Sequence, residues 1–192
     1  MATIGLRDLH YALLTADSST AVTYGTPVKL SGAIAANVNP NASAATLFAD
    51  DGPYENATTL GEIEVELNVA DIDASHQNTL LGHSYINGVL IKKSTDQPPY
   101  VALGYKTLKS NGSYRYTWLL KGKFVAGEQD NNTKGDSIEF TTPTLTGSFV
   151  KREFDDVWQI QADDDDSSLT SGYITAWFTA VPTVPTAATS DS

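Results

Sequence analysis

The stretch SYRYTWLLKGKF, residues 113–124, alternates bulky apolar side chains with polar and charged ones. A period of two over this length is typical of a β-strand with one buried face. The segment therefore predicts a mainly β fold, with the core on the aromatic side of this strand. The side chains expected on that side are Tyr114, Tyr116, Trp118, Leu120 and Phe124.

The segment before it, residues 100–108, is also strand-like, and Asn111-Gly112 lies between the two. Asn-Gly between alternating segments favours a type I′ hairpin, whose two-residue loop pairs Tyr105 with Trp118. In this register the cations lie opposite the aromatics, and we expect them to contact a neighbouring copy. A solvated face is the alternative, whereas binding of single-stranded nucleic acid would need exposed aromatics beside the cations. The candidate cationic face consists of Lys106, Arg115, Lys121 and Lys123.

A second alternating segment, residues 61–69, carries the opposite charge. Ile63, Val65 and Leu67 form its apolar side, so it predicts another half-buried strand. Its exposed side is a carboxylate row that complements the cationic face in sign and matches its spacing. The row consists of Glu62, Glu64 and Glu66.

Several further segments are expected to be strands, and one, DIDASHQNTLLGH, to be a helix. Asp71 or Asp73 is the expected N-cap of that helix, and Gly82 is expected to end it. The phase of alternation changes around Pro143, which predicts a bulge or bend within residues 137–152. The other expected strands are Leu9–Thr15, Val28–Ala36, Ala45–Ala49, Tyr85–Lys92, residues 157–162 and residues 172–181.

Length and composition indicate one domain, since the chain has 192 residues, a formal net charge of −11 and no Cys. We expect a domain at residues 1–162, followed at 163–192 by an acidic turn and an extension that adds one more strand and a loose tail. An acidic balance argues against general binding to nucleic acid or anionic membranes. With neither a secretory signal nor a membrane span in the sequence, we expect assembly in the cytoplasm.

No constellation of residues predicts an enzyme. Asp163–Asp166 lack the spacing, central glycine and terminal glutamate of a calcium loop. His10, His76 and His83 lack the spacing of a metal site, and neither a Gly-x-Ser-x-Gly elbow nor a phosphate-binding loop is present. We therefore expect no catalysis, no metal and no cofactor.

Several stretches of the chain resemble the major tail proteins of long-tailed (siphovirus) bacteriophages, which polymerise into the tail tube. The similarity runs in order over about residues 2–160 and is weaker after Asp163. It is carried by the opening MATIGLRDLHYALLT and by ATLFADDG (45–52), LGYKTLKSNG (103–112) and TPTLTG (142–147).

The resemblance implies a tail-tube-type β-sandwich or half-barrel with one flanking helix and long loops. It also implies a non-catalytic structural protein of the virion tail that assembles into hexameric rings in the bacterial host cytoplasm. Such rings stack around a tape-measure protein and meet tail terminator and baseplate or distal tail proteins. Double-stranded DNA passes through the tube without specific binding, and no membrane or cofactor is involved.

Under this hypothesis the carboxylate row either lines the lumen or meets a neighbour's cationic face. The turn-rich stretch Ala49–Gly61 is expected to be a loop that orders when rings stack. The alternative function is a β-sandwich binding module, such as a carbohydrate- or receptor-binding virion domain with exposed Tyr and Trp and a calcium site at Asp163–Asp166. The candidate ring-stacking residues are Asp50, Asp51, Gly52, Pro53, Tyr54 and Glu55.

Overall fold

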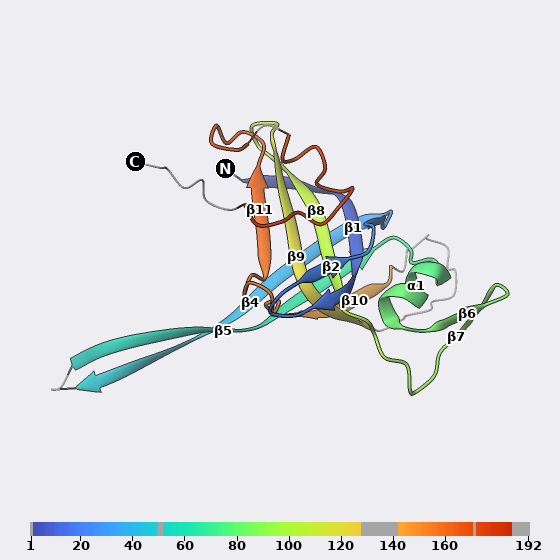
Figure 1. Cartoon of the computed structure of the whole chain (residues 1–192), viewed down its shortest axis with the longest axis horizontal. Coiled ribbons are helices and arrows are strands. Elements are labelled where there is room, and N and C mark those ends of the chain that lie inside the picture. Colours follow the sequence, from blue (N-terminus) through green and yellow to red (C-terminus); the bar gives the residue numbers. More distant parts are fainter. Residues whose placement is uncertain (1, 50–51, 128–141, 171, 186–192) are drawn as a thin grey trace, which may run out of the picture.

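The computed structural model describes residues 2–49, 52–127, 142–170 and 172–185. These residues form a nine-stranded antiparallel sheet, a separate two-stranded hairpin and one helix (Figure 1). The prediction of a mainly β fold with one helix is confirmed. The strand order is β2-β1-β8-β9-β10-β5-β4, with β3 paired to β1 and β11 paired to β9. The elements are β1 (Thr3–Asp17), β2 (Val22–Tyr24), β3 (Val28–Lys29), β4 (Ala33–Ala49), β5 (Gly52–Val69), α1 (Ala74–Leu81), β6 (Ser84–Ile86), β7 (Val89–Ile91), β8 (Val101–Lys109), β9 (Tyr114–Ala126), β10 (Thr144–Phe149) and β11 (Gln159–Asp163).

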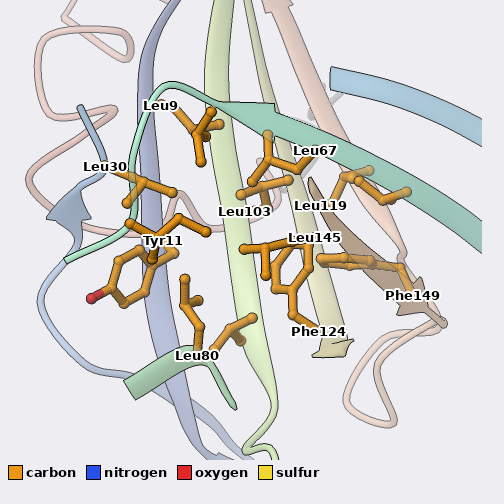
Figure 2. Packing of buried hydrophobic residues seen from close by; sticks show 14 of the residues in the cluster. Leu9, Tyr11, Leu30, Leu67, Leu80, Leu103, Leu119, Phe124, Leu145 and Phe149 are labelled. Carbon is orange, nitrogen blue, oxygen red and sulfur yellow. The ribbon is translucent and has the colours of Figure 1, made fainter. Parts of the chain in front are cut away.

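The main core lies on one face of the large sheet, and side chains from five of its strands and from α1 meet there (Figure 2). Leu9 of β1, Leu67 of β5 and Phe124 of β9 are almost completely buried in it, and Leu80 brings α1 against the sheet. β1 and β4 stand far apart in the strand order yet approach each other in space. The sheet therefore curls around this core in the manner of a half-barrel.

A second core lies on the opposite face of β1, β8 and β9, where the chain after β11 covers the sheet. The indole Nε1 of Trp118 donates to the backbone carbonyl of Trp177 at 2.9 Å. The rings of His10 and Phe178 stack with their centres 4.5 Å apart. Residues 172–179 form consecutive turns, so the strand predicted at 172–181 is wrong. Packing of their aromatic residues against the sheet produces the apolar pattern there, without strand pairing.

β9 is buried on both faces because the main core and the second core lie on opposite sides of it, and a β-bulge reverses its alternation partway along. Val101 pairs with Gly122 but Leu103 pairs with Leu119, so β9 has one extra residue at Leu120–Lys121. The bulge falls where the outer partner of β9 changes from β11 to β10. Leu119 and Phe124 consequently enter the main core, whereas Trp118 and Leu120 enter the second. The prediction of a single apolar face along this strand is therefore wrong.

The β8–β9 turn also differs from the prediction. Lys109 N donates to Ser113 O and Gly112 N donates to Lys109 O, and only Gly112 of the loop has a positive φ. This is a three-residue loop with a glycine bulge, not a type I′ turn, and it shifts the register by one residue. Trp118 is thus opposite Gly104, and Tyr105 is opposite Thr117.

The type I′ turn lies elsewhere in the chain. Asn87 and Gly88 both have positive φ and join β6 to β7 inside the stretch predicted as one strand, Tyr85–Lys92. The predicted strand Val28–Ala36 is likewise divided into β3 and β4, because Gly32 has a φ of 80° that strands do not adopt. The helix prediction is confirmed, with Asp73 as N-cap and Gly82 left-handed at the C-terminus. Residues 128–141, with the first part of the strand predicted around Pro143, lie outside the described residues.

Candidate assembly surfaces

The β4–β5 hairpin continues well beyond the core as an arm (Figure 1). Pro40 pairs with Ile63 but Ala42 pairs with Leu60, so β5 has a bulge at Gly61–Glu62 where the arm leaves the body. On the body side of this bulge, alternate β5 side chains are buried. Beyond it, no described side chain of either strand is buried. The arm is therefore a paired ribbon in which none of the described side chains contributes to a core.

The prediction of a loop over Ala49–Gly61 is wrong for the described residues. Gly, Pro, Asn and Thr gave this stretch the composition of a turn, but residue-by-residue pairing with β4 satisfies its backbone as a strand. Of the candidate ring-stacking residues, Gly52, Pro53, Tyr54 and Glu55 begin β5. Asp50 and Asp51 lie outside the described residues.

The carboxylate row is exposed, as predicted, at the base of the arm. Glu62, Glu64 and Glu66 alternate with buried apolar residues of β5. In the described part of the chain none of the three forms an ion pair. Across the sheet, Glu64 lies opposite Ser148 of β10, and Ser148 lies opposite Lys123 of β9. Lys123 is therefore on the same face as Glu64, two strands away.

The four predicted cations do not form one face, which corrects the sequence-based interpretation. Lys106 pairs with Tyr116 and Thr107 pairs with Arg115, so Lys106 and Arg115 point to opposite sides of the sheet. The register shift at the β8–β9 turn is the cause. The Nζ of Lys106 lies 4.7 Å from the ring centre of Tyr114, so this cation also shares a side with the aromatics.

Most of these cations are neutralised inside the chain. Lys106 forms an ion pair with Asp8 at 2.7 Å, and Lys121 forms one with Asp17 at 2.6 Å. Hydrogen bonds from Lys106 and then Lys29 lower the pKa of Asp8 to about 2. The Nζ of Lys123 has no such partner among the described carboxylates and lies 4.4 Å from the ring centre of Tyr100. An interface through these cations would have to compete with their partners in the same chain.

The acidic turn Asp163–Asp166 holds the β8–β9 turn. Arg115 contacts Asp163 with two hydrogen bonds of 2.8 and 3.0 Å, and the buried Lys109 reaches both Asp163 and Asp165. These contacts, with Arg115 first, lower the pKa of Asp163 to about 2, and Lys109 followed by Asn111 lowers that of Asp165 to about 2. The carboxylates of the acidic turn thus neutralise Lys109 and Arg115 of the β8–β9 hairpin. Both carboxylate oxygens of Asp163 and of Asp165 are occupied by these contacts.

Two histidines and two tryptophans make contacts within the described residues. His76 Nδ1 and the Tyr11 hydroxyl are hydrogen-bonded at 2.9 Å, and His83 Nδ1 contacts Asp96 at 2.8 Å. Within the described ranges, no group of three His, Cys, Asp or Glu could hold a metal ion. Trp118 and Trp177 are buried and cannot serve as ligand platforms, whereas Tyr54, Tyr85 and Tyr100 are exposed. In the same ranges no helix has the length and apolar character to cross a membrane.

One exposed apolar surface was not singled out from the sequence. β6 and β7 pair only with each other, and their side chains include four exposed large hydrophobic residues. The available signal was the Asn87-Gly88 pair flanked by apolar residues, which is typical of a two-residue hairpin. The exposed residues are Tyr85, Ile86, Val89 and Ile91.

Neither a protein-family model nor a curated protein matches this chain.

Proposed function

We propose that the protein is a structural virion protein whose copies assemble into stacked, hexameric rings forming the tail tube of a siphovirus-like bacteriophage. The observation that carries the proposal is the β4–β5 arm. A ribbon of paired strands in which no described side chain is buried gains little stability alone, and exposed strand edges are sites at which further chains pair. Contact with other copies of the chain would bury the side chains and strand edges of the arm and so stabilise it.

The charge distribution supports the same function. Duplex DNA carries about one phosphate charge per 1.7 Å, so a basic lumen would retain the genome by counterion release. This chain has 23 acidic and 12 basic residues. The described cations are in large part paired with the chain's own carboxylates, while Glu62, Glu64 and Glu66 remain exposed. We infer that double-stranded DNA passes such a surface without specific binding.

The remaining partners and the setting follow from the resemblance alone. They are a tape-measure protein in the lumen, tail terminator and baseplate or distal tail proteins at the ends, and the virion tail assembled in the host cytoplasm. Neither an enzymatic activity nor a cofactor is part of the proposal.

Negative-stain microscopy of the purified protein at increasing concentration tests the proposal directly. We expect rings or tubes. Persistent monomers, with shifts on addition of glycans or calcium, would contradict it and favour the binding module.

A shortened arm gives a sharper version of this test. Replacing residues 43–59 by Asn-Gly joins Ala42 to Leu60, two residues that already pair, through a favourable two-residue turn. Because no described side chain in the removed part is buried, this short-arm variant should keep the wild-type unfolding midpoint, with a circular dichroism spectrum still typical of a β-sheet. It should also remain unassembled. A short-arm variant that forms normal tubes would show that the arm is not the assembly element.

Charge reversal of the carboxylate row distinguishes its two possible roles. Changing Glu62, Glu64 and Glu66 to Lys leaves the buried side of β5 untouched, so folding should persist. If the row faces the lumen, tubes should form normally but phages carrying the variant should eject DNA more slowly, with the delay decreasing as salt rises. Loss of tubes would assign the row to an interface between copies.

A further inference from the structure

The β6–β7 hairpin exposes four large apolar side chains within six strand residues. Ile86 and Val89 flank its turn and are 56% and 58% exposed, and Tyr85 and Ile91 are exposed beside them. The hairpin pairs with no strand of the main sheet. Two-stranded hairpins are only marginally stable in water, and clustered exposed hydrophobic residues mark interaction sites. This surface is therefore expected to be covered by another molecule.

The charge beside the hairpin indicates which kind of molecule. Lys92 and Lys93 follow β7 directly, and both are exposed. Neither forms an ion pair with a described carboxylate, whereas seven other Lys and Arg side chains do. The hairpin thus presents apolar side chains bordered by two adjacent positive charges, and an acidic partner with some apolar surface fits it.

We propose that the β6–β7 hairpin, together with Lys92 and Lys93, binds the distal β4–β5 arm of a second copy of this chain. That part of the arm, residues 43–59, contains Asp50, Asp51 and Glu55 and no Lys or Arg. Its Tyr54 is 74% exposed next to Glu55, and Leu60 at the base of this part is 44% exposed. The arm therefore supplies negative charge to complement Lys92 and Lys93, and apolar side chains to pack against those of the hairpin.

The positions of the two elements require the contact to be between copies. The arm leaves one end of the molecule and the β6–β7 hairpin lies at the opposite end (Figure 1). The two surfaces differ, so each copy can bind one neighbour with its arm and another with its hairpin. Heterologous contacts of this kind extend in one direction and do not stop at a dimer. The inference rests on the proposed function in this respect, because it names the surface that receives the arm.

Two variants, each lacking one half of the contact, test this inference without requiring tubes. The short-arm variant keeps the hairpin. The blocked-hairpin variant keeps the arm and carries Ile86→Ser, Val89→Ser, Lys92→Glu and Lys93→Glu, all at exposed positions. We expect a mixture of the two to form a heterodimer in sedimentation velocity, with association at least about tenfold tighter than that of either variant with itself. Circular dichroism confirms that both are folded before mixing.

Exchanging the charges of the two surfaces tests whether the arm is the segment that binds the β6–β7 hairpin. Adding Lys92→Glu and Lys93→Glu to the short-arm variant should abolish the heterodimer. Changing Asp50, Asp51 and Glu55 to Lys in the blocked-hairpin variant should restore it. Equal binding of the short-arm variant to itself would show that another surface covers the hairpin, and folded variants that do not associate when mixed would overturn the inference.

The result also separates this contact from the proposed function. Tubes from the wild-type chain without association of the two variants would leave the tail-tube function standing and refute the contact. Association of the variants together with open wild-type chains that never close into rings would support the contact and contradict the tube.

Discussion

Gly104 of β8 lies directly opposite Trp118 of β9, and the indole ring covers the position that a side chain at residue 104 would occupy. A Cβ atom built there would be 2.5 Å from Cε2 of the ring. Trp118 is completely buried and its Nε1 is held by the carbonyl of Trp177, so the ring cannot move aside easily. The close approach of β8 to the second core therefore depends on glycine.

We predict that Gly104→Ala destabilises the protein by about 1–3 kcal/mol through this overlap. Urea unfolding followed by tryptophan fluorescence measures the change. Gly5→Ala in β1 is the matched control, because nothing lies within 4 Å of its added Cβ. Equal stability of the two variants would show that the ring is free to shift.

The same pair shows why the hairpin register could not be predicted from the sequence. Both a type I′ turn and a loop with a glycine bulge use Gly after Asn, so the dipeptide does not distinguish them. The choice depends on contacts from far along the chain, since Asn111 Nδ2 and Ser113 Oγ both donate to Asp165. By contrast, the buried side of β5 and the ends of α1 follow from local patterns and were predicted correctly.

The candidate surfaces also include features that local sequence patterns predict and features that depend on contacts distant in the sequence. The exposed carboxylates of β5 were predictable because alternation alone determines which side of a strand faces water. The partners of the cations were not, because Asp17 lies 104 residues from Lys121 and Asp163 lies 48 residues from Arg115. The arm was also missed, since its strand pairing overrides a turn-like composition.

The C-terminal segment is predicted to be part of the domain and not an appendage. Trp177 is buried in the second core. The centre of its ring lies 5.8 Å from that of Tyr116 and 5.6 Å from that of Tyr173. Trp177→Ala should therefore lower the free energy of unfolding by about 3–5 kcal/mol. The exposed Thr175→Ala in the same series of turns should change it by less than about 0.5 kcal/mol. A small effect at Trp177, measured by urea unfolding, would mean that residues after 162 add little to the core.

Two neighbouring cations are predicted to differ sharply in their contribution to stability. Arg152 is 2% exposed and donates from Nε and Nη2 to Asp155 at 2.7 and 2.6 Å. Arg152→Ala leaves that carboxylate without its partner and should cost about 3 kcal/mol. Lys151 pairs with Asp156 at the surface, so Lys151→Ala should cost less than about 1 kcal/mol. Thermal unfolding of both variants checks this, and similar losses would contradict the importance of burial.

The acidic turn is predicted to make the protein sensitive to low pH. The cations around Asp163 and Asp165 hold both pKa values at about 2, below the ordinary 3.8. A carboxyl group whose pKa is lower in the folded state stabilises the fold fully above its unfolded pKa, and this contribution disappears as the pH falls through the folded pKa. Unfolding midpoints in urea should therefore decrease between about pH 4 and pH 2.

Asp163→Asn tests the origin of that decrease. The variant should be less stable than the wild type at pH 6, because Arg115 and Lys109 lose a charged partner. Its midpoint should also fall less steeply below pH 4, since one of the carboxylates responsible has been removed. Glu64→Gln, which breaks no ion pair among the described residues, should keep the wild-type slope. An unchanged slope in Asp163→Asn would mean that the acid sensitivity arises elsewhere, with Asp8 the next carboxylate to test because its pKa is also about 2.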